Sequence, residues 1–250
     1  MSTAKKATIK DCKIKAMVWG EAGAGKTRFA LSAPSPLVID LENSTGWYSE
    51  QFDFYKATID EKNKMSKNAT ILTTTIINEI LAGEYPDVET LIIDPITDLL
   101  DNLESLCTLQ FEKDILKGKK VTDLNPLEKS KFYSFRRTKT RELLDRIINL
   151  DLNIIFVARA KNVWGKTDKG MAPVDKTFDG IDLIEYLPDL VLNLRRVNDE
   201  PVADIKKSRM GKFTESTKME KWDDLLSLMI EKKENSRANV LKIKKSKEAV

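Results

Sequence analysis

The chain has 250 residues, of which 41% are hydrophobic and 32% are charged, so it can bury one substantial core. Its 42 Lys+Arg and 39 Asp+Glu leave a net charge of +3, which does not by itself indicate a polyanion-binding protein. Histidine is absent, and the two cysteines, Cys12 and Cys107, lie far apart. The composition excludes imidazole catalysis and histidine-ligated zinc, and it argues against a disulfide framework or a thiolate metal site.

The first fifteen residues are polar and lysine-rich, without the apolar segment of a secretory signal. The sequence also contains no run that approaches 18 uninterrupted apolar residues. We therefore expect a cytoplasmic protein that does not act at a membrane.

Short apolar runs typical of strands alternate with longer helical patterns. The predicted strands are Ile14–Trp19, Leu37–Leu41, Leu91–Ile93, Asn153–Ala158, Leu190–Leu194 and Val202–Ile205. The predicted helices are Lys26–Ser32, Ile71–Leu81, Ile96–Leu116, Pro126–Leu150, which begins after the N-cap residue Asn125, and Glu220–Lys232. This alternation predicts an α/β fold with a mostly parallel central sheet and helices on both faces. We expect one domain over 11–232, a flexible N-terminus over 1–10 and a basic C-terminal tail over 233–250.

A phosphate-binding motif of the form G-x-x-x-x-G-K-[ST] follows the first predicted strand and opens the first predicted helix. Its glycines let backbone N–H groups turn toward phosphate oxygens, Lys26 supplies a positive charge to the β- and γ-phosphates, and Thr27 is a Mg²⁺ ligand. The alternative is an ordinary glycine-rich turn. The motif predicts an ATP site with Mg²⁺, formed by Gly20, Glu21, Ala22, Gly23, Ala24, Gly25, Lys26, Thr27 and Arg28.

A second acidic position follows the apolar run Leu91–Ile93, where Asp94 precedes Pro95 and a predicted helix. A carboxylate at the end of a buried strand neighbouring the phosphate-binding loop can hold Mg²⁺ through water. The alternative is that Asp94 only caps the helix that follows. We predict that Asp94 is the second magnesium residue.

The segment Val38-Ile39-Asp40-Leu41-Glu42 after the second strand, together with Leu91-Ile92-Ile93-Asp94, resembles the RecA-type recombinase ATPases. The resemblance covers roughly residues 10–215, and its closest form is the compact RecA-like ATPases of bacteriophages, some of which assist single-strand annealing. It implies that Glu42 activates the attacking water as general base. The alternative is that Glu42 is a solvated acid in a loop.

The same resemblance implies roles for three more cations. Arg159 follows the strand Asn153–Ala158, where the family carries a γ-phosphate sensor that is usually glutamine or histidine. Lys207 and Arg209 match a Lys-x-Lys/Arg pair that reaches the nucleotide of the neighbouring subunit. The alternatives are a surface ion pair for Arg159 and a solvated hairpin for the other two.

The segment 160–188 contains no clear strand or helix pattern and is too long for an ordinary connection, so we expect a functional or mobile loop. In RecA-like proteins this region resembles the DNA-binding loop. Cations that follow phosphates and an indole that stacks on a base suit single-stranded DNA, which nominates Lys161, Trp164, Lys166 and Lys169. The alternatives are that the lysines serve solubility and that Trp164 packs on the domain.

The sequence and the resemblance together predict a Mg-ATP hydrolase of DNA recombination or single-strand annealing, cytoplasmic in a bacterial host if phage-encoded. Its expected partners are single-stranded DNA, further copies of itself in a ring or filament, and replication or recombination proteins. A nucleotide-controlled loader or assembly factor without DNA contact is the main alternative. A small-molecule phosphotransferase is less favoured, because the strand that ends at Glu42 is not needed for that chemistry.

Overall fold

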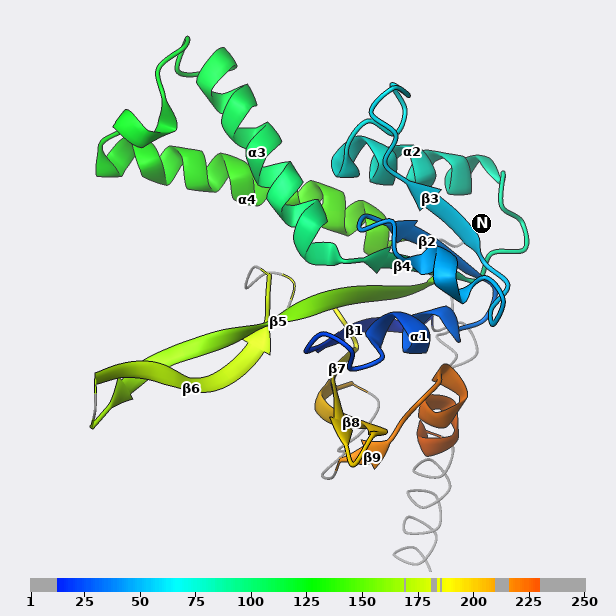
Figure 1. The fold of residues 1–250 in the computed structure, drawn as a ribbon. Coiled ribbons are helices and arrows are strands. Elements are labelled where there is room, and N and C mark those ends of the chain that lie inside the picture. The colour runs from blue at the N-terminus through cyan, green and yellow to red at the C-terminus, as the bar shows by residue number, and fades with distance from the viewer. Residues whose placement is uncertain (1–12, 169, 181–183, 185, 210–215, 230–250) are drawn as a thin grey trace, which may run out of the picture.

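The computed structural model describes residues 13–168, 170–180, 184, 186–209 and 216–229, which form one nine-stranded sheet with helices packed on it (Figure 1). The predicted flexible N-terminus and basic tail lie outside these residues. The strands are β1 (Lys15–Gly20), β2 (Pro36–Asp40), β3 (Tyr55–Thr58), β4 (Thr90–Asp94), β5 (Asn153–Thr167), β6 (Gly170–Phe178), β7 (Leu190–Val197), β8 (Glu200–Ser208) and β9 (Thr217–Lys218). The helices are α1 (Lys26–Leu31), α2 (Ala69–Ala82), α3 (Ile96–Asp114) and α4 (Pro126–Ile148), and residues 222–229 are also helical.

The sheet is mostly parallel, as predicted. Its strands lie in the order β3-β2-β4-β5-β1-β7-β8-β9, and every neighbouring pair from β3 to β7 is parallel. Within the described part of the chain, the antiparallel pairs are β5–β6, β7–β8 and β8–β9. The predicted α/β fold class is therefore confirmed.

Alternation along the strands divides the interior between the two faces of the sheet. In β1, Met17 and Trp19 pack with α2, α3 and α4, whereas Ala16 and Val18 pack on the other face with α1 and Trp222. The other central strands alternate in the same way. Because both faces are covered, the strands read as continuous apolar runs, which is why the sequence indicated them.

Helix α4 begins where the sequence predicts. Asn125 accepts a hydrogen bond from the backbone N–H of Glu128 at 3.0 Å, and the Glu128 carboxylate accepts one from the Asn125 N–H at 3.1 Å. This capping box satisfies two amides at the start of the helix. Helices α3 and α4 project together beyond the sheet, and Phe111, Leu124 and Phe132 form a small cluster on this projection (Figure 1).

The prediction of a loop over 160–188 is wrong for most of that segment. Strand β5 continues past the core to Thr167 and pairs antiparallel with β6, which forms a hairpin that projects from the sheet (Figure 1). Outside the core the hairpin is held mainly by its own backbone pairing, and Val163, Trp164 and Val174 are exposed. The sequence therefore lacked the burial pattern that indicates a strand.

Two further strands were missed for a similar reason. The edge strand β3 has two exposed and two half-buried residues, and β9 has only two residues. In the sheet, β5 lies between β4 and β1. Among the described residues, no helix is both long and apolar enough to cross a bilayer.

Gly20 marks a close approach between β1 and β7. A Cβ at Gly20 would lie 2.2 Å from the backbone oxygen of Leu194, an atom that cannot turn aside. Since the two strands pair at this point, only hydrogen fits there. The last residue of β1 is thus fixed by packing as well as by the phosphate-binding motif.

We predict that Gly20→Ala lowers the free energy of unfolding by about 1–3 kcal/mol, because β1 and β7 must separate to admit the methyl group. Urea titration followed by circular dichroism measures this change. Gly46→Ala is the control, since a Cβ there meets only the flexible Lys56 Nζ at 3.7 Å. Equal midpoints for the two variants would contradict the packing argument.

Candidate functional site

Four of the six predicted catalytic residues, Lys26, Glu42, Asp94 and Arg159, gather at the edge where the parallel strands end. The register pairs Gly20 of β1 with Arg159 of β5, and Asp40 of β2 with Asp94 of β4. The backbone N–H of Leu41 donates to the backbone carbonyl oxygen of Asp94 at 2.8 Å. This bond fixes the turn after β2 against the end of β4. Ligand sites of open α/β sheets lie at this edge.

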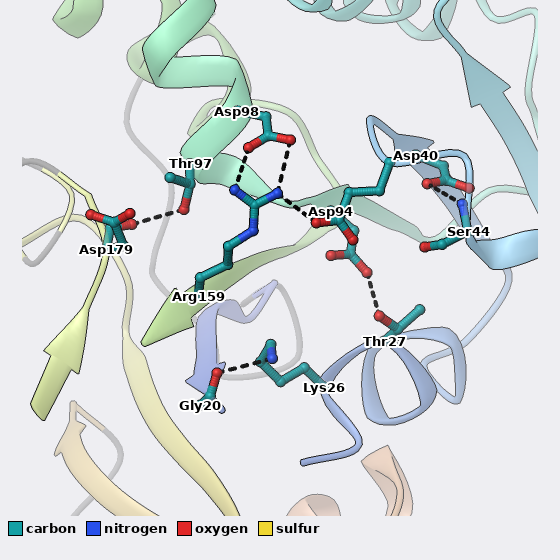
Figure 2. Close-up of polar contacts among 11 residues, drawn as sticks. Gly20, Lys26, Thr27, Asp40, Ser44, Asp94, Thr97, Asp98, Arg159 and Asp179 are labelled. Atoms are coloured by element: carbon teal, nitrogen blue, oxygen red, sulfur yellow. Dashed lines mark hydrogen bonds and ion pairs between the residues drawn. The ribbon is translucent and has the colours of Figure 1, made fainter. Parts of the chain in front are cut away.

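The loop between β1 and α1 adopts a turn that suits phosphate. Gly25 precedes α1 with φ of 92°, a left-handed conformation that glycine adopts without steric cost. The Lys26 ammonium bends back over the loop and donates to the carbonyls of Gly20 at 3.0 Å and Glu21 at 2.8 Å (Figure 2). Burial lowers the pKa of Lys26, although nearby carboxylates including Asp94 oppose this shift. Phosphate oxygens of a bound nucleotide can replace these two carbonyl oxygens as acceptors for the Lys26 ammonium.

Thr27 and Asp94 meet directly. The Thr27 hydroxyl donates to Asp94 Oδ2 at 2.6 Å, and Asp94 is only 6% exposed (Figure 2). Burial raises the pKa of Asp94 to about 6, the neighbouring carboxylates of Glu42 and Asp40 add to the rise, and the bond from Thr27 opposes it. A hydroxyl and a carboxylate are hard oxygen donors of the kind that Mg²⁺ prefers, so this pair fits the magnesium that the motif implies.

Asp40 organises the turn that carries Glu42. Its carboxylate accepts hydrogen bonds from the Ser44 N–H at 3.1 Å and from both the N–H and the hydroxyl of Thr45 at 2.8 and 2.7 Å. Burial would raise the pKa of Asp40, but these hydrogen bonds outweigh it and the pKa is lowered. A charged, buried Asp40 thus holds the turn in a single shape.

Glu42 lies in an ion-pair network with Arg159. Arg159 Nη2 donates to Glu42 Oε1 at 2.5 Å, and the guanidinium also contacts Asp98 at the start of α3 (Figure 2). Hydrogen bonding to Glu42 is the largest cause that raises the pKa of Arg159. The expected place of Arg159 at a strand end is wrong, since β5 continues to Thr167, but its side chain reaches the site.

Two residues of the loop motif direct their side chains elsewhere. Arg28 forms an ion pair with Glu220 at 3.3 Å. Glu21 forms one with Lys176 of β6 at 2.6 Å, so the hairpin touches the phosphate-binding loop. Arg196, near the end of β7, donates to the Gly23 carbonyl at 3.2 Å and also lies against this loop.

Lys207 and Arg209 lie at the opposite edge of the sheet. Both donate to the Tyr186 carbonyl at 3.1 Å, and Arg209 pairs with Asp189, whose N–H bonds to Lys15 at the start of β1. The two cations therefore share one direction, as their spacing predicts.

Three of the four nominated DNA residues, Lys161, Trp164 and Lys166, lie on the outer part of β5, in the β5–β6 hairpin. Lys161 donates to the Gly180 carbonyl at 3.2 Å and lies 3.7 Å from Asp179. Trp164 is 60% exposed, so the alternative that it packs on the domain is wrong. Lys166 is exposed, and Lys169 lies outside the described residues.

Three site residues escaped sequence reasoning: Asp98, Lys176 and Arg196. Asp98 stands four residues after Asp94, in the first turn of α3, and this closeness in the chain was the one local signal available. The other two come to the loop from strands distant in the chain, and no local pattern indicates that contact.

A comparison with protein-family models finds one match, described as an AAA domain, over residues 12–223. This range contains the loop, both acidic strand ends and the hairpin. No curated protein matches the sequence at a significant level.

The raised pKa of Asp94 predicts a pH dependence of stability in the absence of Mg²⁺ and nucleotide. Between its ordinary value of 3.8 and its folded value of about 6, the folded state binds more protons than the unfolded state. The stability of the native sequence should therefore fall by about 3 kcal/mol relative to Asp94→Asn as pH rises from about 4 to about 6, then level off. Chemical denaturation across this range tests it, and a constant difference between the two proteins would contradict it.

Proposed function

This chain belongs to the AAA domain family, and from that premise we propose that it binds and hydrolyses Mg-ATP in DNA recombination or single-strand annealing. The family match supports nucleotide-binding ATPase activity. The role on single-stranded DNA is the finer part of the proposal and depends on the hairpin described above.

The observation that carries the ATPase proposal is the contact between Thr27 and Asp94 beside the Lys26 ammonium. A triphosphate in the loop would accept hydrogen bonds from its amides and from Lys26, with Thr27 and Asp94 as the residues that hold Mg²⁺. When bound, that ion supplies charge neutralisation at the β- and γ-phosphates.

We assign Glu42 as the general base that activates the attacking water. Arg159 occupies its Oε1, whereas Oε2 has no hydrogen-bond partner among the described residues. A carboxylate oxygen left open beside the loop can accept a proton from a water aligned with the γ-phosphate. Lys26 and Arg159 would stabilise the charge that develops on the transferred phosphoryl group.

We assign Lys207 and Arg209 to the nucleotide of a neighbouring copy in a ring or filament. Two observations support this: both cations point toward one carbonyl, and both lie at the edge away from their own loop. A neighbour that met this edge with its loop would bring them to its γ-phosphate.

Single-stranded DNA is the partner we assign to the hairpin. Lys161 and Lys166 supply charges for phosphates, and the exposed indole of Trp164 supplies a face for a base. A second candidate function, a nucleotide-controlled loader or assembly factor, is favoured by the exposed apolar residues Met171 and Val174 on the same hairpin, which suit a protein partner.

Lys26→Ala should abolish ATP hydrolysis, because it removes the charge that binds the β- and γ-phosphates. Glu42→Gln should retain ATP binding and slow turnover by about 100-fold or more, because the amide cannot accept the proton. Phosphate release and fluorescent-nucleotide titration measure the two effects. Glu50→Gln changes an exposed carboxylate nearby and is the control; turnover in Glu42→Gln equal to that control would remove Glu42 from the role of base.

The double variant Lys161→Ala/Lys166→Ala should weaken binding of a labelled single-stranded oligonucleotide. It should also reduce the slope of log K against log salt by about 1.4, because each lost phosphate contact on a single strand contributes about 0.7. The matched control is Lys62→Ala/Lys64→Ala, which removes the same charge between β3 and α2, away from the hairpin (Figure 1). An unchanged slope in the hairpin variant would exclude this surface.

A further inference from the structure

Three charged side chains from three separate elements form one connected network. Glu42 follows β2, Asp98 stands in the first turn of α3 and Arg159 belongs to β5. Arg159 Nη1 lies 2.8 Å from Asp98 Oδ1, and Nη2 donates to Asp98 Oδ2 at 3.1 Å and to Glu42 Oε1 at 2.5 Å. Sequence reasoning assigned roles to Glu42 and Arg159 but none to Asp98.

The contact between Arg159 and Asp98 is a two-pronged ion pair. Both oxygens of Asp98 face both terminal nitrogens of Arg159, so the planes of the carboxylate and the guanidinium are fixed together (Figure 2). A single contact would leave the long arginine side chain several rotamers. The fork instead aims Nη2 at Glu42.

Asp98 is itself held firmly. Ile96 and Leu99 on either side of it are fully buried, which anchors the start of α3 in the core. The Thr97 hydroxyl donates to the Asp179 carbonyl at 3.0 Å and ties the same turn to the base of the hairpin. The fork therefore extends from a rigid support.

We propose that Asp98 is a positioning residue for ATP hydrolysis, which orients Glu42 by holding Arg159. This inference rests on the proposed function. Asp98 would act through Arg159, its printed contact, and not directly on the water or the phosphate. It fixes the guanidinium, the guanidinium holds Glu42 Oε1, and Glu42 Oε2 stays free to align the water.

A role in stability alone does not account for this geometry. Side chains of Arg159 and Asp98 are 47% and 32% exposed, and ion pairs of such exposure contribute little to folding. The network is better explained by its effect on the orientation of the Glu42 carboxylate.

Steady-state kinetics tests the proposal. Asp98→Asn keeps the shape of the side chain but removes the charge, and it should lower kcat for ATP about tenfold with KM within twofold. Arg159→Lys, which keeps the charge but cannot form the fork, should show the same loss. Asp98→Glu should recover part of it. Asp101→Asn, one turn further along α3, is the matched control and should stay within twofold of the native protein.

A double-mutant cycle separates positioning from a general effect. If Asp98 acts through Arg159, Asp98→Asn should change kcat less than twofold in an Arg159→Ala background. If the double variant lost kcat by the product of the two single-variant factors, the proposal would be overturned. A change in KM alone, or full activity of Asp98→Asn, would also overturn it.

A spectroscopic measurement keeps the test independent of hydrolysis. In ¹⁵N-arginine-labelled protein, the guanidinium signal removed by Arg159→Lys should show slow rotation, and Asp98→Asn should accelerate that rotation. Rotation that is unaffected by Asp98→Asn would overturn the proposal even if turnover fell. Absence of ATP hydrolysis by the native protein, with the slow rotation present, would instead contradict the proposed function.

Discussion

The hydrogen bond from Thr27 to Asp94 is the contact on which the site depends. It joins the first residues of α1 to the end of β4 across the intervening strand β5, so two motifs distant in the chain share one point. The charges of Glu42, Asp40 and Lys26 lie close enough to Asp94 to shift its pKa. Without this bond, the loop would still be a turn that suits phosphate, but the Asp94 carboxylate, which we propose as a magnesium residue, would have no fixed distance from the loop.

The site holds an excess of acidic side chains in a partly buried space. Asp40, Glu42 and Asp94 lie close enough that each of the first two raises the pKa of the third. Two cations reduce this repulsion. Lys56 Nζ lies 3.3 Å from Asp40 Oδ2, and Arg159 forms an ion pair with Glu42. The carboxylate of Asp94 has only the hydroxyl of Thr27 as a hydrogen-bond partner among the described residues, and it is the carboxylate whose repulsion a divalent cation would relieve most.

Sequence reasoning succeeded where the information is local. The strands β1, β2, β4 and β7 and the inner half of β5 are buried on both faces and read as apolar runs, and the loop motif places Lys26 and Thr27 by spacing alone. Sequence reasoning failed for strands that are held by backbone hydrogen bonds but have mostly exposed side chains, as in β6 and the outer half of β5. Asp98 and Lys176 were missed because their importance arises from neighbours more than sixty residues away in the chain.

In addition to the hydrogen bond from Thr97 at its base, ion pairs attach both strands of the hairpin to the edge that carries the phosphate-binding loop. One strand is fastened through Arg159 to Glu42 and Asp98, and the other through Lys176 to Glu21 of the loop. Each of these ion pairs is solvent-accessible, so each contributes about 1 kcal/mol or less. The hairpin is thus held against the phosphate-binding loop by contacts that take little free energy to break.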